Sequence, residues 1–449
     1  MTETREGTAH RFLPALRRQA IGVFSPGGLG RASLLLLSSS AAARAVGFFA
    51  ALIGAAALGP RQFGEFAFAA TTASLISVAG ILGFVPLTTK QVANAKTGKE
   101  ARDVGRLVVT ITFLLLTLLG VGYWLALANL SPWIPPNLQT SRVAAGMVSI
   151  WAISGGLVQI IGAVLTGHKK FVALANLTLL RGVVVSVSTA TAAYITHSAV
   201  STTMAAALSE ALACAIAVIF TSMSGWLHGS TRAGWRHNGW PLIHGTLAGV
   251  ANLLIMAAIW GSMALLLSTP AGHEQNGGFS LANRLTLAIT FLPSTLATAS
   301  LPFISGDLAV KSRSQRVRRI VLFSSGWAIA SATILAVSSP LLLSLIGASY
   351  TQFTSTVVIM SGAGIAISMN AVLGYLAIAD GRIRLWIISD LVLAAILMSV
   401  AWATVNRWGA EGLATAYLVS YFVSAAMLIP ARSGRQPLAA SVDVSRNDG

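Results

Sequence analysis

The chain repeats apolar runs of about twenty residues from one end to the other, and this pattern restricts where it can fold. An α-helix of that length crosses a hydrocarbon layer ~30 Å thick. Only 10% of the 449 residues are charged, whereas a soluble domain carries about 25%. Most of the protein surface therefore faces something other than water, and the sequence predicts an all-α integral membrane protein.

Twelve of these runs are predicted to span the membrane as helices, because short connections leave backbone groups no other partners. The predicted boundaries are an N-terminal tail at 1–31, a first lobe at 32–223, a cytoplasmic loop at 224–241, a second lobe at 242–430 and a cytoplasmic tail at 431–449. The expected spans are 34–58, 65–86, 107–128, 143–165, 171–194, 200–223, 242–267, 279–303, 320–344, 354–378, 385–405 and 412–430.

Lysine and arginine are distributed very unevenly between alternating loops. With the N-terminus in the cytoplasm, 24 of them fall in cytoplasmic segments and only Arg61, Arg142 and Arg407 fall in outer loops. The positive-inside rule then predicts that both termini are cytoplasmic. The net charge of +17 is spread over these short clusters and forms no basic groove, so we expect no nucleic-acid partner. The first thirty residues lack an apolar segment with a cleavage site, so no removed signal peptide is expected.

Several sequence features recur at an offset of 214 residues. Phe63-Gly64-Glu65-Phe66 opens the second span, and Gly277-Gly278-Phe279 opens the eighth. A second pair of segments precedes the fifth and eleventh spans, and it consists of Gly167-His168-Lys169-Lys170 and Gly381-Arg382-Ile383-Arg384. The pattern favours two six-helix lobes of the same orientation, related by duplication. Any regular array of helices also produces such matches, which is the alternative explanation.

The sequence contains little that is typical of an enzyme. No two histidines have metal-ligand spacing beside a carboxylate or a cysteine, and the single cysteine, Cys214, lies within an apolar run. The glycines at 27–30 follow no strand, so they do not open a nucleotide-binding fold. Outer loops of at most about twenty residues disfavour an intramembrane glycan polymerase or ligase. We expect no catalysis, no cofactor and no metal.

Ionisable residues within the spans are the candidate functional residues, because a charge at membrane depth costs at least ~2.5–3.5 kcal/mol. Arg44 and Arg284 have no acidic partner in their own helical hairpins, and Asn283 precedes the second of them. Together they predict a cationic cavity between the lobes that suits phosphate through bidentate hydrogen bonds. The alternative for Arg284 is that its side chain extends to the lipid headgroups.

Two further positions within the spans are polar. Arg181 and Glu210 lie at similar depths in adjacent helices, so they either form a structural ion pair or contribute to the cavity. Asp390 is expected either to pair locally with Arg384 or Arg382, or to act as a coupling site. Its counterpart at the offset of 214 is Asn176, which favours an inward-facing polar position in both lobes.

The order of short motifs resembles a known family of transporters over most of residues 34–430. The motifs are Leu58-Gly59-Pro60 with Phe63-Gly64, Thr166-Gly167-His168-Lys169-Lys170-Phe171, Ala282-Asn283-Arg284-Leu285 with Leu292-Pro293 and Leu301-Pro302, Leu345-Ile346-Gly347 with Tyr350, and Trp408-Gly409-Ala410-Glu411-Gly412-Leu413-Ala414. They resemble the polysaccharide transporter branch of the multidrug/oligosaccharidyl-lipid/polysaccharide exporter superfamily, which contains the O-antigen flippases.

The resemblance implies two six-helix lobes in a V around a central cavity, which is alternately open to either side of the membrane. It implies a polyprenyl diphosphate-linked oligosaccharide as substrate and a location in the bacterial inner membrane. Related lipid II flippases carry arginines on the first and eighth helices facing a cationic lumen, and Arg44 and Arg284 lie on the matching helices. Those flippases add two C-terminal helices, so an exopolysaccharide, O-antigen or capsule unit is expected here.

Two other functions stay open at this stage. One is a cation-coupled multidrug antiporter of the same fold, which would favour an acidic cavity, and the other is an intramembrane glycan polymerase or ligase. The expected partners are the lipid-linked glycan, membrane lipids, and a glycan polymerase with its export machinery.

Overall fold

The computed structural model describes residues 29–130, 142–304, 310–380 and 382–429, and these ranges are helical almost throughout. The predicted all-α fold is confirmed. Residues 1–28 of the predicted N-terminal tail and the whole of the predicted C-terminal tail lie outside the described residues, whereas residues 29–31 begin the first helix. The helices are α2 (Leu29–Ile81), α3 (Phe84–Asn94), α4 (Gly98–Leu130), α5 (Arg142–Gly167), α6 (Phe171–Thr196), α7 (Ala199–Met223), α8 (Thr231–Leu267), α9 (Gly272–Ile304), α10 (Val310–Ile346), the 3-10 helix η3 (Ala348–Phe353), α11 (Thr354–Ala379) and α12 (Ile383–Leu428).

Two of these helices each contain two of the predicted spans. α2 is interrupted at Gly59, whose φ of 69° is a left-handed conformation that favours glycine, and Pro60 follows without a backbone N–H. α12 is interrupted in the same way at Gly409, where φ is 54°. The expected loops at 59–64 and 406–411 are therefore single-residue kinks. With both kinks counted, the long helices of the described ranges make twelve straight segments.

Length and apolarity alone identify nine helices of the described ranges as able to cross a membrane, with α2 and α12 counted once each. α9 is not among them, and its apolar run is interrupted by Asn283 and Arg284. Three helices begin about ten residues before the predicted spans, at Gly98, Thr231 and Val310. The expected loop at 224–241 is thus helical from Thr231 onward, because polar residues continue a helix into water without an apolar signal.

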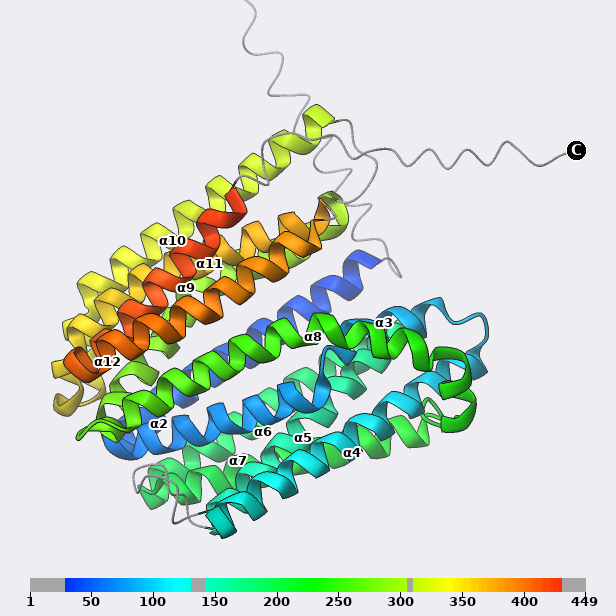
Figure 1. The fold of residues 1–449 in the computed structure, drawn as a ribbon, viewed down its shortest axis with the longest axis horizontal. Helices are drawn as coiled ribbons and strands as arrows, with labels where there is room; N and C mark the ends of the chain where they lie inside the picture. Colours follow the sequence, from blue (N-terminus) through cyan, green and yellow to red (C-terminus); the bar gives the residue numbers. More distant parts are fainter. Residues whose placement is uncertain (1–28, 131–141, 305–309, 381, 430–449) are drawn as a thin grey trace, which may run out of the picture.

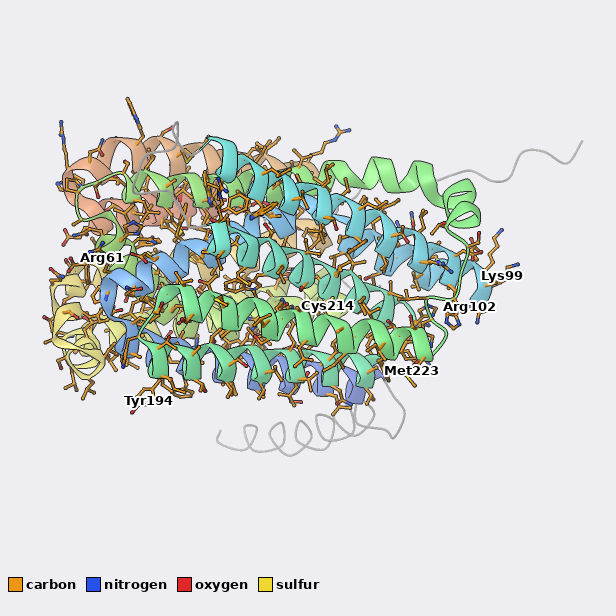
Figure 2. All side chains as sticks on the ribbon, turned by 90° about the horizontal axis from the view of Figure 1, so that it is seen from below. Arg61, Lys99, Arg102, Tyr194, Cys214 and Met223 are labelled. Carbon is orange, nitrogen blue, oxygen red and sulfur yellow. The ribbon has the colours of Figure 1, made fainter. Side chains whose placement is uncertain are left out.

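The helices are grouped in two bundles with α2 and α8 between them (Figure 1). α3 to α7 form one bundle and α9 to α12 form the other, and α2 packs on α6 in its own bundle and on α9 in the other. We call the first bundle with α2 the N-lobe, and the second the C-lobe. Arg61 and Tyr194 lie at one end of the molecule, whereas Lys99, Arg102 and Met223 lie at the opposite end (Figure 2). The two ends are named the Arg61 end and the Lys99 end below.

The lobes touch closely at the Arg61 end. Asn276 of α9 donates a hydrogen bond from Nδ2 to the Gly64 carbonyl of α2 at 2.7 Å, and the Tyr350 hydroxyl donates to the Ala55 carbonyl at 3.1 Å. A methyl group on Gly64 would overlap the His273 carbonyl, and one on Gly277 would overlap the Pro60 carbonyl. The backbones of the two lobes are therefore in direct contact at this end.

The same contacts recur in both lobes, which supports the predicted repeat. Gln62 accepts a hydrogen bond from the Ala199 N–H at 2.9 Å, and Gln275 accepts one from the Ala410 N–H at the same distance. Each glutamine lies near the start of one helical segment. Its side chain bonds to the first turn of the last helical segment in the same lobe. The two lobes therefore share this hydrogen bond at matching places, as a duplication would lead us to expect.

The offset of 214 is wrong by two residues at the turn before the fifth and eleventh spans. Lys170 N–H donates to the Leu165 carbonyl at 2.9 Å, and Arg382 N–H donates to the Ala377 carbonyl at 2.8 Å, an offset of 212. Glycines and basic residues do not mark the register here, because it is set by the hydrogen-bonded turn that follows α5 and α11. In that register Asp390 matches Thr178, not Asn176.

The connection between the lobes is attached to the N-lobe at the Lys99 end. Asp103 of α4 accepts a hydrogen bond from the Ser230 N–H at 2.5 Å, and Arg106 donates to the Gly229 carbonyl at 2.9 Å. The Lys170 ammonium lies 5.6 Å from the centre of the Trp226 ring, a cation–π contact. Next along the chain, α8 packs against α3 and α4 and later against α12. One helix therefore contacts both lobes.

His168, at the end of α5 beside this connection, makes the stability of the Lys99 end pH-dependent. Burial and the nearby Lys170 and Arg102 charges lower its pKa below the ordinary 6.5, so the folded state disfavours its protonation. The unfolded chain binds that proton more readily, and stability therefore falls as the pH drops below 6.5. The thermal unfolding midpoint in detergent, measured at a series of pH values below 6.5, reports this loss of stability. We expect the midpoint of His168→Phe to fall less steeply with decreasing pH than that of the wild type. An identical slope in both proteins would contradict the assignment to His168.

Candidate functional site

Arg44 lies at the contact between the lobes. It sits in the first half of α2, and its guanidinium carbon is 5.6 Å from the centre of the Phe291 ring on α9 of the other lobe. A cation over an aromatic face is attracted by the ring quadrupole, so this contact holds the charge between the lobes. The side chain is exposed in the structure and accessible to a ligand.

Arg284 reaches from α9 of the C-lobe to a cavity of about 180 Å³ in the N-lobe. The cavity is lined by α2, α5, α6 and α7, and the Arg284 side chain is also exposed. The Arg284 side chain therefore lies between the lobes. It does not extend toward the lipid headgroups, which was the alternative left open by the sequence. Asn283 beside it is half-buried. Within the described ranges the ion pairs are Arg61–Glu65 and Arg181–Glu210, so neither Arg44 nor Arg284 is paired there.

The wall of this cavity combines small, aromatic and hydroxyl-bearing residues. Small residues of α2 leave the space open, at Gly47, Ala50, Ala51 and Gly54. Aromatic rings come from α2 and α5, and Trp151 is stacked on Phe66 with ring centres 6.0 Å apart. Hydroxyl groups come from α6 and α7, at Ser186, Thr189 and Thr202. Pockets for small molecules are typically built in this way, from apolar walls with a few convergent polar groups.

Arg181 and Glu210 form an ion pair, which is one of the two arrangements expected from the sequence. Arg181 Nε lies 2.6 Å from Glu210 Oε1, and the two side chains are 33% and 2% exposed. Gly155 of α5 faces the pair, since a methyl group there would lie 3.3 Å from Glu210 Oε1. The pair therefore joins α5, α6 and α7 inside the N-lobe, and neither residue lines the 180 Å³ cavity.

Asp390 is buried and follows directly in sequence on Ser389, which belongs to a hydrogen-bonded polar cluster of the C-lobe. It is 8% exposed, and beside it Ser389, Ser424 and Asn370 form hydrogen bonds, with Ser424 Oγ 2.6 Å from both Ser389 Oγ and Asn370 Nδ2. The sequence predicted an ion pair of Asp390 with Arg382 or Arg384. Among the described residues, neither arginine is paired with it.

Asn176 does not share the environment of Asp390. It is exposed on the same face of α6 as Val172 and Leu179, both of which are also exposed. In the corrected register it matches Ile388, which is 50% exposed. The expectation of an inward-facing polar position in both lobes is wrong for Asn176, since a helix face of exposed apolar residues is typical of contact with lipid.

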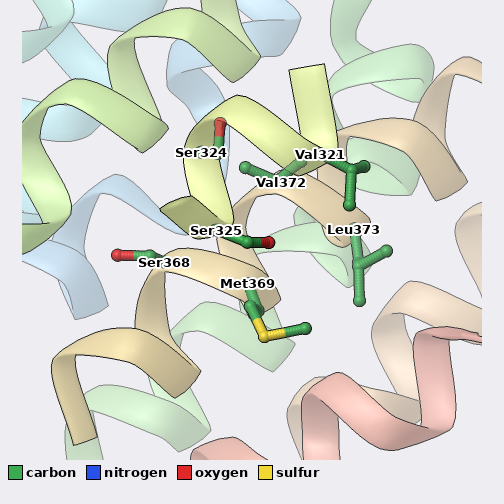
Figure 3. A pocket seen from close by; sticks show the side chains of 7 residues that line it. All are labelled: Val321, Ser324, Ser325, Ser368, Met369, Val372 and Leu373. Atoms are coloured by element: carbon green, nitrogen blue, oxygen red, sulfur yellow. The ribbon is translucent and has the colours of Figure 1, made fainter. Parts of the chain in front are cut away.

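A second void lies between α10 and α11 and is too small to be a binding site (Figure 3). Its volume is about 10 Å³, room for at most one water molecule. Ser324 and Ser368 face it, and Ser368 donates its proton to the Gly364 carbonyl at 2.8 Å. Across the part of the chain that the structure describes, no three His, Cys, Asp or Glu residues cluster as metal ligands.

The sequence identified the charged residues of the site but not the cavity wall. Trp151, Ser186, Thr189 and Thr202 lie on three different helices, and nothing in the order of the residues brings them together. The one available signal was the row of small residues on α2 from Gly47 to Gly54, at helical spacing. Such rows occur wherever membrane helices approach closely, so this signal alone does not predict a cavity.

Three solved structures similar to this chain are transporters. A lipid II flippase, MurJ, in an inward closed conformation aligns with a TM-score of 0.71 and 13% identity, covering 89% of this chain and 87% of that one. An inward-facing multidrug resistance MATE family transporter of the MOP superfamily aligns at 0.65 and 13%, covering 89% and 97%. The MATE transporter VcmN of Vibrio cholerae, in a bent form, aligns at 0.56 and 15%, covering 88% and 97%.

These likenesses show the fold alone, because the identities are low. No protein-family model matches the chain, and no curated protein matches it. The protein therefore has the fold of a multi-pass, all-α membrane transporter, shared with a flippase and with multidrug transporters.

Proposed function

We propose that the protein is a flippase that moves a polyprenyl diphosphate-linked oligosaccharide across the bacterial inner membrane, for export of an exopolysaccharide, O-antigen or capsule. The observation that carries the proposal is the pair of unpaired arginines, Arg44 and Arg284, contributed to one interface by opposite lobes. A guanidinium binds phosphate oxygens through two parallel hydrogen bonds. Arg284 lies seven residues, about two helical turns, before Phe291, so it shares one face of α9 with the ring that Arg44 contacts. Two guanidinium groups placed in this way suit a diphosphate.

The mechanism needs no covalent chemistry. A diphosphate and its sugars do not cross hydrocarbon unaided, since removing charges and hydroxyl groups from water is very costly. The cationic space between the lobes binds the headgroup while the polyprenyl chain stays in the bilayer. Because Arg44 and Arg284 belong to different lobes, separation of the lobes changes the distance between them and releases the headgroup. In the predicted orientation the Arg61 end faces outward, so the described conformation is closed to the outside.

One observation favours the alternative of a cation-coupled multidrug antiporter. Asp390 is a buried carboxylate without an ion pair in the described ranges, and a cation or proton there would suit an antiporter. Asp390 lies apart from the 180 Å³ cavity, however, and the charged group that lines that cavity is Arg284. A cationic cavity disfavours cationic drugs, which is why the flippase is the leading proposal.

Cells lacking the protein should accumulate polyprenyl diphosphate-linked oligosaccharide on the cytoplasmic face of the membrane. The quantity to measure is the fraction protected from a glycan-modifying reagent added outside the cells. We expect wild type to clear it and Arg44→Ala to fail, because a lost charged contact costs about 1.5–3 kcal/mol, or roughly tenfold or more in binding. Arg407→Ala is the control, since Arg407 is exposed and distant in sequence from the site.

The outcomes separate the competing functions. The oligosaccharide could accumulate in the deletion strain and be cleared equally by Arg44→Ala and Arg407→Ala. That result would leave the flippase proposal standing and refute the role of Arg44. Absence of accumulation in the deletion strain, with new sensitivity to cationic drugs, would replace the flippase by the antiporter.

A further inference from the structure

We propose that the 180 Å³ cavity of the N-lobe binds one sugar ring of the substrate, next to the diphosphate, with Arg284 at the boundary between the two groups. This inference rests on the proposed flippase function and assigns one part of the substrate to a subsite. Its support comes from the size of the cavity, its unused hydrogen-bonding groups and its depth relative to Arg44.

The size suits a ligand larger than water. One water molecule needs about 10–15 Å³ of such volume, so the cavity has space for roughly a dozen. The small side chains of Gly47 and Gly54 create this space opposite α6, where Ser186 Oγ would lie 3.4 Å from a methyl group placed on Gly47. A single pyranose ring is a compact group on this scale, whereas an entire oligosaccharide is not.

The hydrogen-bonding groups match a ligand rich in hydroxyls. The Ser186 hydroxyl and the Trp151 indole N–H bond to no residue among those described, although a partly buried Trp N–H usually has a partner. Thr189 and Thr202 each donate a hydrogen bond of 2.8 Å to a carbonyl of their own helix, at Val185 and Ser198, which leaves both oxygens free to accept. The wall thus supplies both donors and acceptors.

The aromatic side of the cavity suits the apolar face of a sugar ring. A pyranose has apolar C–H faces and polar edges, and the C–H face packs on a flat aromatic ring. Trp151 is half-buried and lines the cavity, and its stacking on Phe66 with an angle of 21° between the rings holds the indole in place. The Arg284 guanidinium adds donors in a planar arrangement that suits sugar hydroxyls or the carboxylate of an acidic sugar.

The depth of the cavity separates it from the diphosphate. Before the kink at Gly59, the α2 residues that line it run from Gly47 to Leu58, three to fourteen positions beyond Arg44 toward the Arg61 end. At 1.5 Å per residue this is about 4–21 Å further from the Lys99 end. A lipid-linked substrate that enters from the cytoplasmic leaflet places its diphosphate nearest the lipid and its sugars further in. Arg44 is thus positioned for the diphosphate and the cavity for a sugar.

Binding of defined lipids to the full-length protein in nanodiscs tests the inference. The probes are polyprenyl diphosphate alone and the same lipid carrying one glucose, one N-acetylglucosamine or one glucuronic acid. We expect wild type to bind at least one glycosylated lipid about tenfold tighter than the bare lipid, the gain expected from one or two net hydrogen bonds. Trp151→Ala should abolish this gain and Thr189→Val should reduce it, with binding of the bare lipid unchanged.

Thr178→Val is the matched control, since Thr178 lies on the same helix, makes the same 2.8 Å bond to its own backbone and does not line the cavity. Equal binding of all four lipids by wild type would overturn the sugar subsite and leave the flippase intact. Failure of wild type to bind any of them would refute the proposed function itself. Loss of bare-lipid binding in both Trp151→Ala and Thr189→Val would show that the cavity wall is structural, which also overturns the inference.

Discussion

Replacing Gly277 with alanine should force the two lobes apart at the Arg61 end. The added methyl group would overlap the Pro60 carbonyl of the other lobe, and a backbone atom cannot move aside as a flexible side chain can. Overpacking of this kind costs about 1–3 kcal/mol. Each lobe also has packed clusters of its own, around Val104 in the N-lobe and Leu373 in the C-lobe. We therefore expect the strain to be relieved by separating the lobes, which shifts the conformational equilibrium by roughly 5–150-fold.

Thiol labelling measures this shift directly. The single native cysteine, Cys214, is only 7% exposed, so an introduced cysteine dominates the signal. We expect Ala51→Cys, inside the cavity, to react faster with a membrane-impermeant reagent applied from the Arg61 side when Gly277→Ala is also present. Gly122→Ala is the control, because a methyl group there meets nothing within 4 Å. Equal labelling in both backgrounds would show that the Gly277 contact does not close this end.

The Arg181–Glu210 pair should be far more sensitive to loss of the arginine than of the glutamate. Arg181→Met leaves the Glu210 carboxylate, 2% exposed, without its counter-charge, and breaking a buried pair in this way costs about 3–5 kcal/mol. Glu210→Gln leaves an arginine that is one-third exposed and can reach other partners. The double variant Arg181→Met with Glu210→Leu should recover most of the loss, since no buried charge is left.

Thermal unfolding in detergent checks this order of stabilities. The matched control is Arg61→Met, which breaks the 3.8 Å ion pair with Glu65 at the surface, where such a pair is worth about 0–1 kcal/mol. Similar unfolding midpoints for Arg181→Met and Arg61→Met would mean that the buried pair contributes no more than a surface pair.

The spans were predictable because a continuous apolar run has few alternatives in a membrane. The places where the prediction failed are local conformations that hydropathy does not report. Gly59 and Gly409 bend a helix with one residue, where a loop of several residues was expected. Helical turns outside the apolar layer, as at Thr231, carry no apolar signal at all.

The site was predictable only in its charges. Arg44 and Arg284 are conspicuous because an arginine in an apolar run is costly, and this cost is independent of the neighbouring helices. Serine and threonine do not stand out in an apolar run, because each can donate its hydroxyl proton to a carbonyl of its own helix, as Thr189 does. Whether such a residue faces lipid or a cavity depends on helix packing. The mismatch between Asp390 and Asn176 has the same origin, because two residues of error in register rotate a position to another face of the helix.

The shared position of α8 has a mechanical consequence for any rocking motion. Its first part follows a connection attached to α4 and packs against the N-lobe, where a methyl group on Gly249 would overlap the backbone at Leu82 and Gly83. Its later part packs against α12 of the C-lobe, where Gly261 faces Met398, and also against α2 of the N-lobe, where Trp260 donates a hydrogen bond to Thr72 at 2.9 Å. When the lobes rotate relative to each other, the later half of α8 has contacts with both of them, so the helix has to flex or exchange one set of these contacts. If the protein transports as proposed, the elastic energy of this one helix contributes to the balance between its conformations, and we expect substitutions that stiffen or soften it to change transport without contacting the substrate.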